Sequence, residues 1–228
     1  MQAMILAAGR GERMRPLTDN LPKPLLPVAG KPLIVWHLEK LSQAGIKQVV
    51  INHAWLGNLL EAHLGNGAQF GLEIRYSTEQ TALETAGGIA KALPLLGTEP
   101  FLVINGDIWC DWDVTLAPGL ATQLKKQDHL AWLLLVPNPA HHPEGDFELS
   151  ASGEIVPGNT NCQTFSGIGI YDPALFRSIT IGQPAKLAPL LRHAISNRSV
   201  SGKLHTGMWV DVGTPERLIA LDQQIKST

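Results

Sequence analysis

Short apolar runs bounded by glycine or polar residues recur along the first half of the chain and predict buried or half-buried β-strands. Four segments are predicted in this way, at residues 3–8, 49–51, 72–76 and 101–104. Three intervening segments carry helix start or stop signals, at residues 32–44, 56–64 and from 85 towards 93. Strands that alternate with helices predict a parallel sheet with right-handed crossovers and helices on both faces.

The pattern changes after residue 113. Three further strands are predicted, at residues 130–136, 164–171 and 208–212. Two short segments flank Ser152-Gly153 like the arms of a hairpin, at residues 146–149 and 154–156. Helices are predicted at residues 187–196 and from 214 or 215 to 226. We expect an α/β fold in three layers, with a mixed, mostly parallel, Rossmann-like sheet and a small β-rich insertion packed on that sheet.

Composition narrows the class of protein. The 228 residues suit one large domain, and a net charge of −2 gives no reason to expect a nucleic-acid or anionic membrane surface. No apolar stretch approaches the roughly 18 residues of a membrane span, and the first apolar run is too short for a secretory signal. Cys110 and Cys162 form no close pair, which favours free thiols. We therefore expect a cytoplasmic protein.

The segment after the first predicted strand is a long loop, residues 9–31, with four prolines. Loops of this length in compact domains are usually functional. Glycines that follow a strand let successive backbone N–H groups approach an anion. A dinucleotide fingerprint fails because Met14 stands at its third glycine, and no Walker A sequence is present. Arg13, and Lys23 between two prolines, add positive charge beside a predicted phosphate site.

Two aspartates, Asp107 and Asp211, come directly after or near the end of predicted strands. In open α/β sheets the ligand lies beyond the carboxyl ends of the strands, so both are expected to face the phosphate loop. Taken alone, either could be a helix cap or turn residue. Asp111 and Asp113 compete with Asp107 but lie past the strand end. Adjacent His141 and His142 do not have metal-site spacing, so we expect no histidine or cysteine metal centre.

The residues from 6 to 18, Leu-Ala-Ala-Gly-Arg-Gly-Glu-Arg-Met-Arg-Pro-Leu-Thr, are followed by Pro22-Lys23-Pro24. This order resembles the pattern of the sugar-1-phosphate nucleotidylyltransferases, with Glu12 in place of the commoner serine or threonine. The resemblance extends to residues 84–88, 105–107 and 209–214 and so covers nearly the whole chain. It implies a glycosyltransferase-A-like fold in one domain, with residues 1–113 as the nucleotide-binding half and 114–228 as the sugar-binding half.

The resemblance also implies a reaction and a set of roles. A sugar 1-phosphate attacks the α-phosphorus of a nucleoside triphosphate and expels pyrophosphate, with Mg²⁺ held by Asp107 and Asp211. Arg13 and Lys23 are the implied catalytic cations, and residues 79–88 read the base. The implied nucleotide-binding residues are Ala8, Gly9, Gly11, Glu12, Arg13, Lys23, Gly88 and Asn105. A phosphate monoester is largely anionic at neutral pH, so no general base is required.

Residues 51–57, 94–97 and 145–147 are similar to a subgroup that transfers UMP from UTP to N-acetylmuramate 1-phosphate in cell-wall sugar recycling. Asp146, Thr164 and Lys186 are the candidate sugar-binding residues, with Arg192 as a second cation. Transfer of GMP to mannose 1-phosphate, or of TMP or UMP to glucose 1-phosphate, stays open because the phosphate and metal elements are shared. A non-catalytic binding module is the alternative of another class. The sequence does not indicate the oligomeric state.

Overall fold

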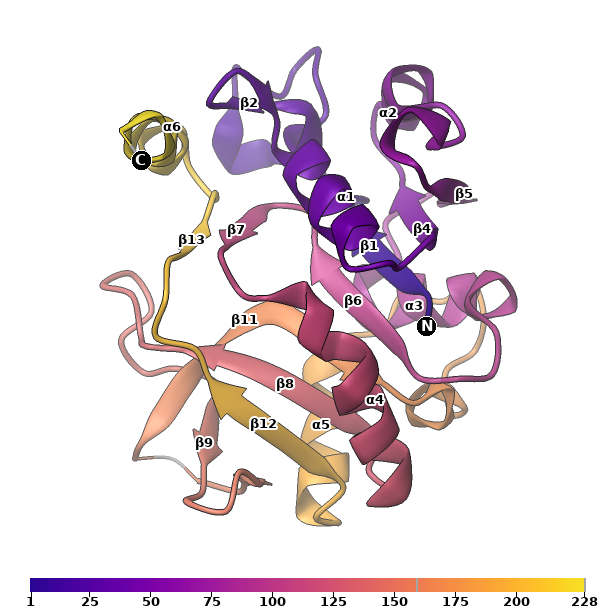
Figure 1. The fold of residues 1–228 in the computed structure, drawn as a ribbon, viewed down its shortest axis with the longest axis vertical. Helices are drawn as coiled ribbons and strands as arrows, with labels where there is room; N and C mark the ends of the chain where they lie inside the picture. Colours follow the sequence, from indigo (N-terminus) through magenta and orange to yellow (C-terminus); the bar gives the residue numbers. More distant parts are fainter. Residues whose placement is uncertain (159, 228) are drawn as a thin grey trace.

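The computed structural model describes residues 1–158 and 160–227, which fold around a nine-stranded sheet (Figure 1). Seven strands follow the order β10-β9-β11-β6-β1-β4-β5, and β8 and β12 extend from β11 as a branch. The strands of this sheet are β1 Ala3–Leu6, β4 Gln48–His53, β5 Glu73–Thr78, β6 Phe101–Asn105, β8 Ala131–Val136, β9 Phe147–Leu149, β10 Ile155–Val156, β11 Cys162–Tyr171 and β12 Val200–Leu204.

The strands of the first half, β6, β1, β4 and β5, are parallel neighbours, as the alternating pattern predicts. Side chains of a strand point alternately to opposite faces, so the two faces of β1 enter different cores. Ala3 and Ile5 pack into one core cluster, while Met4 packs into the other. Helix α1, Leu33–Gln43, covers the first face and α3, Glu84–Leu96, covers the second. This gives the three-layer arrangement that was expected.

The second half continues the same sheet with antiparallel strands. β11 pairs antiparallel with β6 and with β8, and β9 and β10 form the predicted hairpin. Helix α4, Ala117–Lys126, adds residues to the core beneath α1, and α5, Leu187–Ser196, adds residues to the core beneath α3. Both apolar cores therefore continue across the boundary between the two halves.

A third, smaller core holds the long loop after β1 against the C-terminal helix α6, Pro215–Lys226. Met14 and Val28 from the loop pack there with Val212 and Leu221. Two small sheets support the same region, β2 Pro27–Val28 with β3 Lys31–Pro32, and β7 Ile108–Cys110 with β13 Trp209–Asp211. Short 3₁₀ turns at residues 12–14 and 23–25 break the loop.

Most predicted elements are present within one or two residues of their expected bounds, including α2, Gly57–Leu64, and α5. Pro32 was expected as the first helical residue, but it ends β3 and precedes α1. β7, α4 and β12 were not predicted. Both cysteines are free thiols. Within the described residues, every helix is too short or too polar to reach across a bilayer.

Candidate active site

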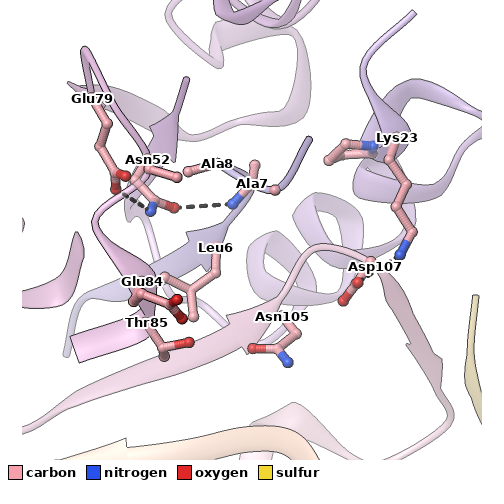
Figure 2. A pocket seen from close by; sticks show the side chains of 13 residues that line it. Leu6, Ala7, Ala8, Lys23, Asn52, Glu79, Glu84, Thr85, Asn105 and Asp107 are labelled. Atoms are coloured by element: carbon pink, nitrogen blue, oxygen red, sulfur yellow. Dashed lines mark hydrogen bonds and ion pairs between the residues drawn. The ribbon is translucent and has the colours of Figure 1, made fainter. Parts of the chain in front are cut away.

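A cavity of about 360 Å³ opens at the carboxyl ends of β1, β4 and β6 (Figure 2). This is the edge at which open α/β sheets bind their ligands. We call it the first cavity. Its lining residues are Leu6, Ala7, Ala8, Gly9, Lys23, Pro24, Asn52, Glu79, Ala82, Glu84, Thr85, Asn105 and Asp107. Five residues named from the sequence, Ala8, Gly9, Lys23, Asn105 and Asp107, are therefore brought together here.

The turn after Gly9 lies beside the cavity and does not line it. Gly11 takes φ +67, and its carbonyl accepts a hydrogen bond of 2.8 Å from the Thr18 hydroxyl, which closes the turn. A Cβ at Gly11 would lie 3.0 Å from Thr18, so glycine suits both the backbone angle and the space. Glu12 and Arg13 are exposed on this turn. Arg13 makes no hydrogen bond or ion pair with a described residue.

Lys23 contacts Asp107 at the wall of the first cavity. The prolines on either side of Lys23 restrict its backbone, and a 3₁₀ turn over Lys23–Leu25 buries the residue to 7% exposure. Its Nζ lies 2.6 Å from Oδ2 of Asp107, whose side chain is 39% exposed. A largely buried ammonium with one carboxylate partner is held in place by that pair, so its position is set before any ligand arrives.

On the wall of the first cavity opposite Lys23, Asn52 joins three segments of the chain (Figure 2). Its Oδ1 accepts from the Ala7 backbone N–H at 3.0 Å, and its Nδ2 donates to Glu79 Oε1 at 2.7 Å. Glu79 Oε2 accepts from the Leu83 N–H at 2.9 Å. Asn52 and Glu79 are each 3% exposed, and their buried side-chain oxygen and nitrogen atoms all have hydrogen-bond partners. A Cβ at Gly88 would lie 2.7 Å from Glu79, so Gly88 supports the network and does not line the cavity.

Asp211 lies close to Asp107 but outside the lining of the first cavity. β13 pairs with β7 so that Asp211 is opposite Ile108, and the Val212 N–H donates to the Asp107 carbonyl at 2.9 Å. The Asp211 Oδ2 accepts from Arg217 Nη1 at 2.7 Å, and Arg217 comes from the first turn of α6. His141 contacts the same pair, with Nε2 2.7 Å from the Arg217 Nη1.

A second cavity, of about 280 Å³, adjoins the first on the side of the insertion. Its residues are Glu84, Thr85, Asn105, Asp146, Phe147, Phe165, Lys186, Leu187, Ala188 and Leu191. The first three of these residues also line the first cavity, so the two cavities share one wall. Lys186 is exposed and forms no ion pair with a described residue. The Asp146 carboxylate accepts from the Phe165 N–H at 2.8 Å and lies 3.2 Å from the His142 ring.

Thr164, a candidate sugar-binding residue, does not line either cavity. It is 5% exposed, and its hydroxyl donates to Asn138 Oδ1 at 2.9 Å, which fixes the loop after β8. The second candidate cation, Arg192, is exposed on α5 and is also outside both linings.

One further group of possible ligand atoms occurs among the described residues, at Cys110, Asp111 and His205, within 4.8 Å of one another. His205 Nε2 is 2.6 Å from Asp111 Oδ1, and Asp111 Oδ2 accepts from the Met208 N–H. Burial raises the pKa of the Cys110 thiol to about 11, so the thiol keeps its proton at neutral pH. These bonds tie the segment before β13 to β7 and give Asp111 a structural role.

The sequence named a phosphate loop, two carboxylates, a base-reading segment and a sugar side, but it gave no role to two residues beside Asp211. Glu84 and Thr85, which line both cavities, fall within the predicted base-reading segment at residues 79–88, although neither was singled out there. Arg217 and His141 contact Asp211. Their positions depend on how α6 begins and on the loop after β8, which only the folded backbone defines. Asn52 lies within the segment at residues 51–57 that carries the subgroup resemblance, so that resemblance was an available signal.

Comparison with known proteins shows which family the chain belongs to. The family model described as nucleotidyl transferase matches residues 2–228, nearly the whole chain. The chain belongs to the nucleotidyl transferase family. Within this family, a protein of Neisseria meningitidis serogroup B named N-acetylmuramate alpha-1-phosphate uridylyltransferase is 57% identical over 96% of this chain and 95% of its own length. A protein of the same name from Caulobacter vibrioides is 35% identical, over 98% and 96% of the two chains.

Solved structures of nucleotidyl transferases agree with the fold. A Bacillus anthracis protein described as a glucose-1-phosphate thymidylyltransferase in complex with a sucrose superposes with a TM-score of 0.87. The alignment covers 100% of this chain and 96% of that protein at 23% identity. The superposition confirms the mixed, mostly parallel sheet, and identity at this level carries no information about the substrate.

Proposed function

We propose that this nucleotidyl transferase moves UMP from UTP to N-acetylmuramate α-1-phosphate and releases pyrophosphate. The observation that carries the proposal is the 57% identity, over nearly the full length of both chains, to a relative with that activity in its name. The two adjoining cavities support it. We infer that residues 1–113 contribute most of the nucleotide site and residues 114–228 most of the sugar site.

The chemistry needs positioned charge and no general base. One oxygen of the sugar phosphate bonds to the α-phosphorus of UTP, the bond from that phosphorus to the bridging oxygen breaks, and pyrophosphate leaves. A phosphate monoester has its second pKa near about 6, so the attacking oxygen is already largely ionised at neutral pH. Stabilisation then comes from fixed positive charge. We assign Lys23 to the α-phosphate because its ammonium is held at the wall of the first cavity.

The loop after β1 is assigned to the triphosphate. Ala8 and Gly9 line the first cavity, and Gly11 shapes the turn that carries Glu12 and Arg13. We assign Arg13 to the departing pyrophosphate. Its side chain is exposed and makes no hydrogen bond or ion pair with a described residue, so it can turn towards a ligand without giving up a partner of its own.

The carboxylates present fit a magnesium ion. Mg²⁺ prefers hard oxygen ligands, commonly one or two carboxylates together with substrate phosphates. Asp107 and Asp211 offer these oxygens from neighbouring backbone positions. Bound there, Mg²⁺ would supply positive charge to the phosphate oxygens. In the protein alone, Lys23 and Arg217 neutralise the two carboxylates.

The sugar is assigned to the second cavity. N-acetylmuramate differs from N-acetylglucosamine by a lactyl ether that ends in a carboxylate. Lys186 lines this cavity and has no carboxylate partner among the described residues, so it is available to a substrate anion. Asp146 borders the same cavity, although its bond to the Phe165 N–H also gives it a structural role.

A substrate screen tests the proposal directly. Pyrophosphate release is measured with each of UTP, GTP and dTTP, paired with N-acetylmuramate, mannose or glucose 1-phosphate, with and without Mg²⁺. We expect turnover with UTP and N-acetylmuramate 1-phosphate that stops when the metal is chelated. Turnover with GTP and mannose 1-phosphate alone would contradict the proposed substrates, and nucleotide binding without any pyrophosphate release would favour a binding module.

The role of Lys186 has its own test. Lys186→Met should raise the KM for N-acetylmuramate 1-phosphate about ten-fold, because a charge-assisted contact contributes 1.5 kcal/mol or more. The KM for N-acetylglucosamine 1-phosphate, which lacks the carboxylate, should stay unchanged. Arg192→Met is the matched control, since Arg192 lies on α5, the helix that begins directly after Lys186, but outside both cavities. Equal changes for the two sugars would remove Lys186 from carboxylate recognition.

A further inference from the structure

Glu84 has a backbone conformation that glycine usually adopts. Among the described residues, five that are not glycine have positive φ: Ala29, Leu56, Glu84, Asp128 and Arg198. Glu84 has φ +58, and it is the only one of these five that lines either cavity. Such a conformation costs roughly 1–3 kcal/mol and persists where the surrounding structure imposes it.

The segments on both sides of Glu84 are anchored. The Leu83 N–H donates to Glu79 at 2.9 Å, and the Ala86 N–H donates to the Ala185 carbonyl at 2.9 Å. The Ala185 N–H donates in turn to the Leu83 carbonyl at 3.0 Å. These bonds hold the start of α3 between the buried network and the segment before α5. Glu84 therefore cannot relax its φ without breaking them.

The Glu84 side chain lies at the junction of the two cavities. It lies at the wall shared by both cavities with Thr85 and Asn105, and Figure 2 shows it across the first cavity from Lys23 and Asp107. Its carboxylate is exposed and makes no hydrogen bond or ion pair with a described residue. The strained position therefore presents an acceptor that the protein itself does not use.

The chemistry of its partner follows from the charges around it. Both proposed substrates are phosphates, which a carboxylate repels, and Lys23 is already paired with Asp107. An ionised carboxylate is only an acceptor, so the group that suits it is a neutral donor. Neutral donors of the proposed substrates include the hydroxyls of the ribose and of the phosphorylated sugar, and a hydroxyl of either can reach a group on the wall that the two cavities share.

We propose that Glu84 is a substrate-positioning residue that accepts hydrogen bonds from a sugar hydroxyl at the junction of the two cavities. The inference rests on the proposed function, because it takes a nucleotide and a sugar phosphate as the occupants. The backbone strain at Glu84 is then a stability cost that keeps the carboxylate at this junction.

Three variants separate strain from chemistry. Glu84→Gly removes both the strain and the carboxylate, so the Tm should rise by about 2–4 °C, and one substrate KM should rise about ten-fold. Glu84→Gln keeps the strain and one acceptor oxygen, so it should leave the Tm unchanged and raise the same KM less. Asp128→Gly is the matched control, because Asp128 has φ +54 in an exposed turn outside both cavities. It should raise the Tm without changing either KM.

Two arms identify the hydroxyl. If it belongs to the ribose, wild-type protein should bind 2′-deoxy-UTP or 3′-deoxy-UTP about ten-fold more weakly than UTP, and Glu84→Gly should not discriminate. If it belongs to the sugar, only the KM for the sugar 1-phosphate should rise in Glu84→Gly. Either result supports the proposal. Wild-type KM values for both substrates in Glu84→Gly would overturn it, as would a lower Tm, which would make Glu84 a structural residue.

The result also separates this inference from the proposed function. Wild-type protein without turnover on N-acetylmuramate 1-phosphate would contradict the proposed substrates. In that case, calorimetric binding of UTP, its deoxy analogues and the sugar phosphates to wild type and Glu84→Gly still decides the role of Glu84. An active wild type with an unaffected Glu84→Gly contradicts only the role of Glu84.

Discussion

The two cavities differ in whether the lysine that lines each of them already has a partner. In the first cavity, Lys23 is bound to Asp107, and Asn52 is bound to Glu79 and to the backbone of Ala7. At the second cavity, Lys186 has no partner among the described residues, and neither does Glu84 on the shared wall. The paired groups are positioned before a ligand binds and suit a phosphate reaction common to a family. The unpaired groups remain available to features that distinguish one sugar from another.

The largest effect is expected from removing Lys23, which is already paired with Asp107 in the first cavity. Lys23→Met should lower kcat/KM by roughly 10²–10³, because preorganised charge is lost at the developing negative charge. The same factor should apply to every sugar phosphate that the protein accepts. Steady-state rates with two sugars check this. Arg13→Met is the comparison variant: it should lower activity without changing the Tm, since Arg13 is exposed and unpaired. If Lys23→Met lost activity with one sugar phosphate only, the contrast drawn between the two cavities would be wrong.

Acid should lower the free energy of unfolding through His37. His37 on α1 is buried beside the backbone of Ile108, and burial, followed by the charge of Lys40, lowers its pKa from 6.5 to about 4. Between these pH values the unfolded chain binds more protons, so this contribution to stability is complete above pH 6.5 and lost as the pH falls towards 4. The loss should reach about 3 kcal/mol.

The measurement is the free energy of unfolding by denaturant from pH 7 to pH 4. His37→Leu should show a shallower pH dependence than wild type, whatever its stability at pH 7. Identical pH dependence in the two proteins would mean that His37 is not the titrating group.

Asn52→Ala should lower the free energy of unfolding by about 2 kcal/mol, because the Ala7 N–H and a Glu79 oxygen lose their buried partner. Denaturant unfolding measures the change. Gln48→Ala on the same strand is the control, since its bond to Glu73 is exposed and should contribute less than about 0.5 kcal/mol. Equal effects of the two substitutions would show that the buried network does not stabilise the first cavity.

The smallest effect is expected at the two carboxylates that we propose as metal ligands. Arg217 neutralises Asp211 and so competes with a metal cation for this carboxylate. Arg217→Met should therefore strengthen Mn²⁺ binding in the absence of nucleotide about ten-fold. Calorimetry or electron paramagnetic resonance measures this. Arg217→Lys keeps the charge and should bind Mn²⁺ like wild type. The gain should disappear in the double variant Arg217→Met, Asp211→Asn, and a gain that persists there would place the metal elsewhere.

The sequence predicted the layers because periodicity reports burial directly. The runs at β1, β4 and β6 are apolar on both faces, and each enters both cores. α4 was missed because Pro118, Gly119 and Thr122 weaken its helical signal. β12 was missed because Gly202 and Lys203 interrupt the apolar pattern of this strand, which pairs with β8. These elements depend on tertiary contacts more than on local preference.

The site was predictable where a motif carries a charge on a rigid segment, as at Lys23 and Asp107. It was not predictable where a contact depends on the angle at which a helix begins. Arg217 reaches Asp211 because Thr214 caps α6, and Gly213 leaves room for the guanidinium. The positive φ of Glu84 likewise could not be predicted from the sequence, because glutamate rarely adopts it. The roles of the individual residues stay predictions until the variants are measured.

The backbone bonds between the start of α3 and Ala185 bear on how new substrate preferences could arise. Both the Ala86 and the Gly87 N–H groups donate to the Ala185 carbonyl, next to Lys186. A chimera that exchanged only residues 183–192 for those of a relative with another sugar would disturb the start of α3, which is bonded to Ala185. Residues 79–88 and 183–192 should therefore be transplanted together, as one cassette, when the substrate range of this scaffold is redesigned.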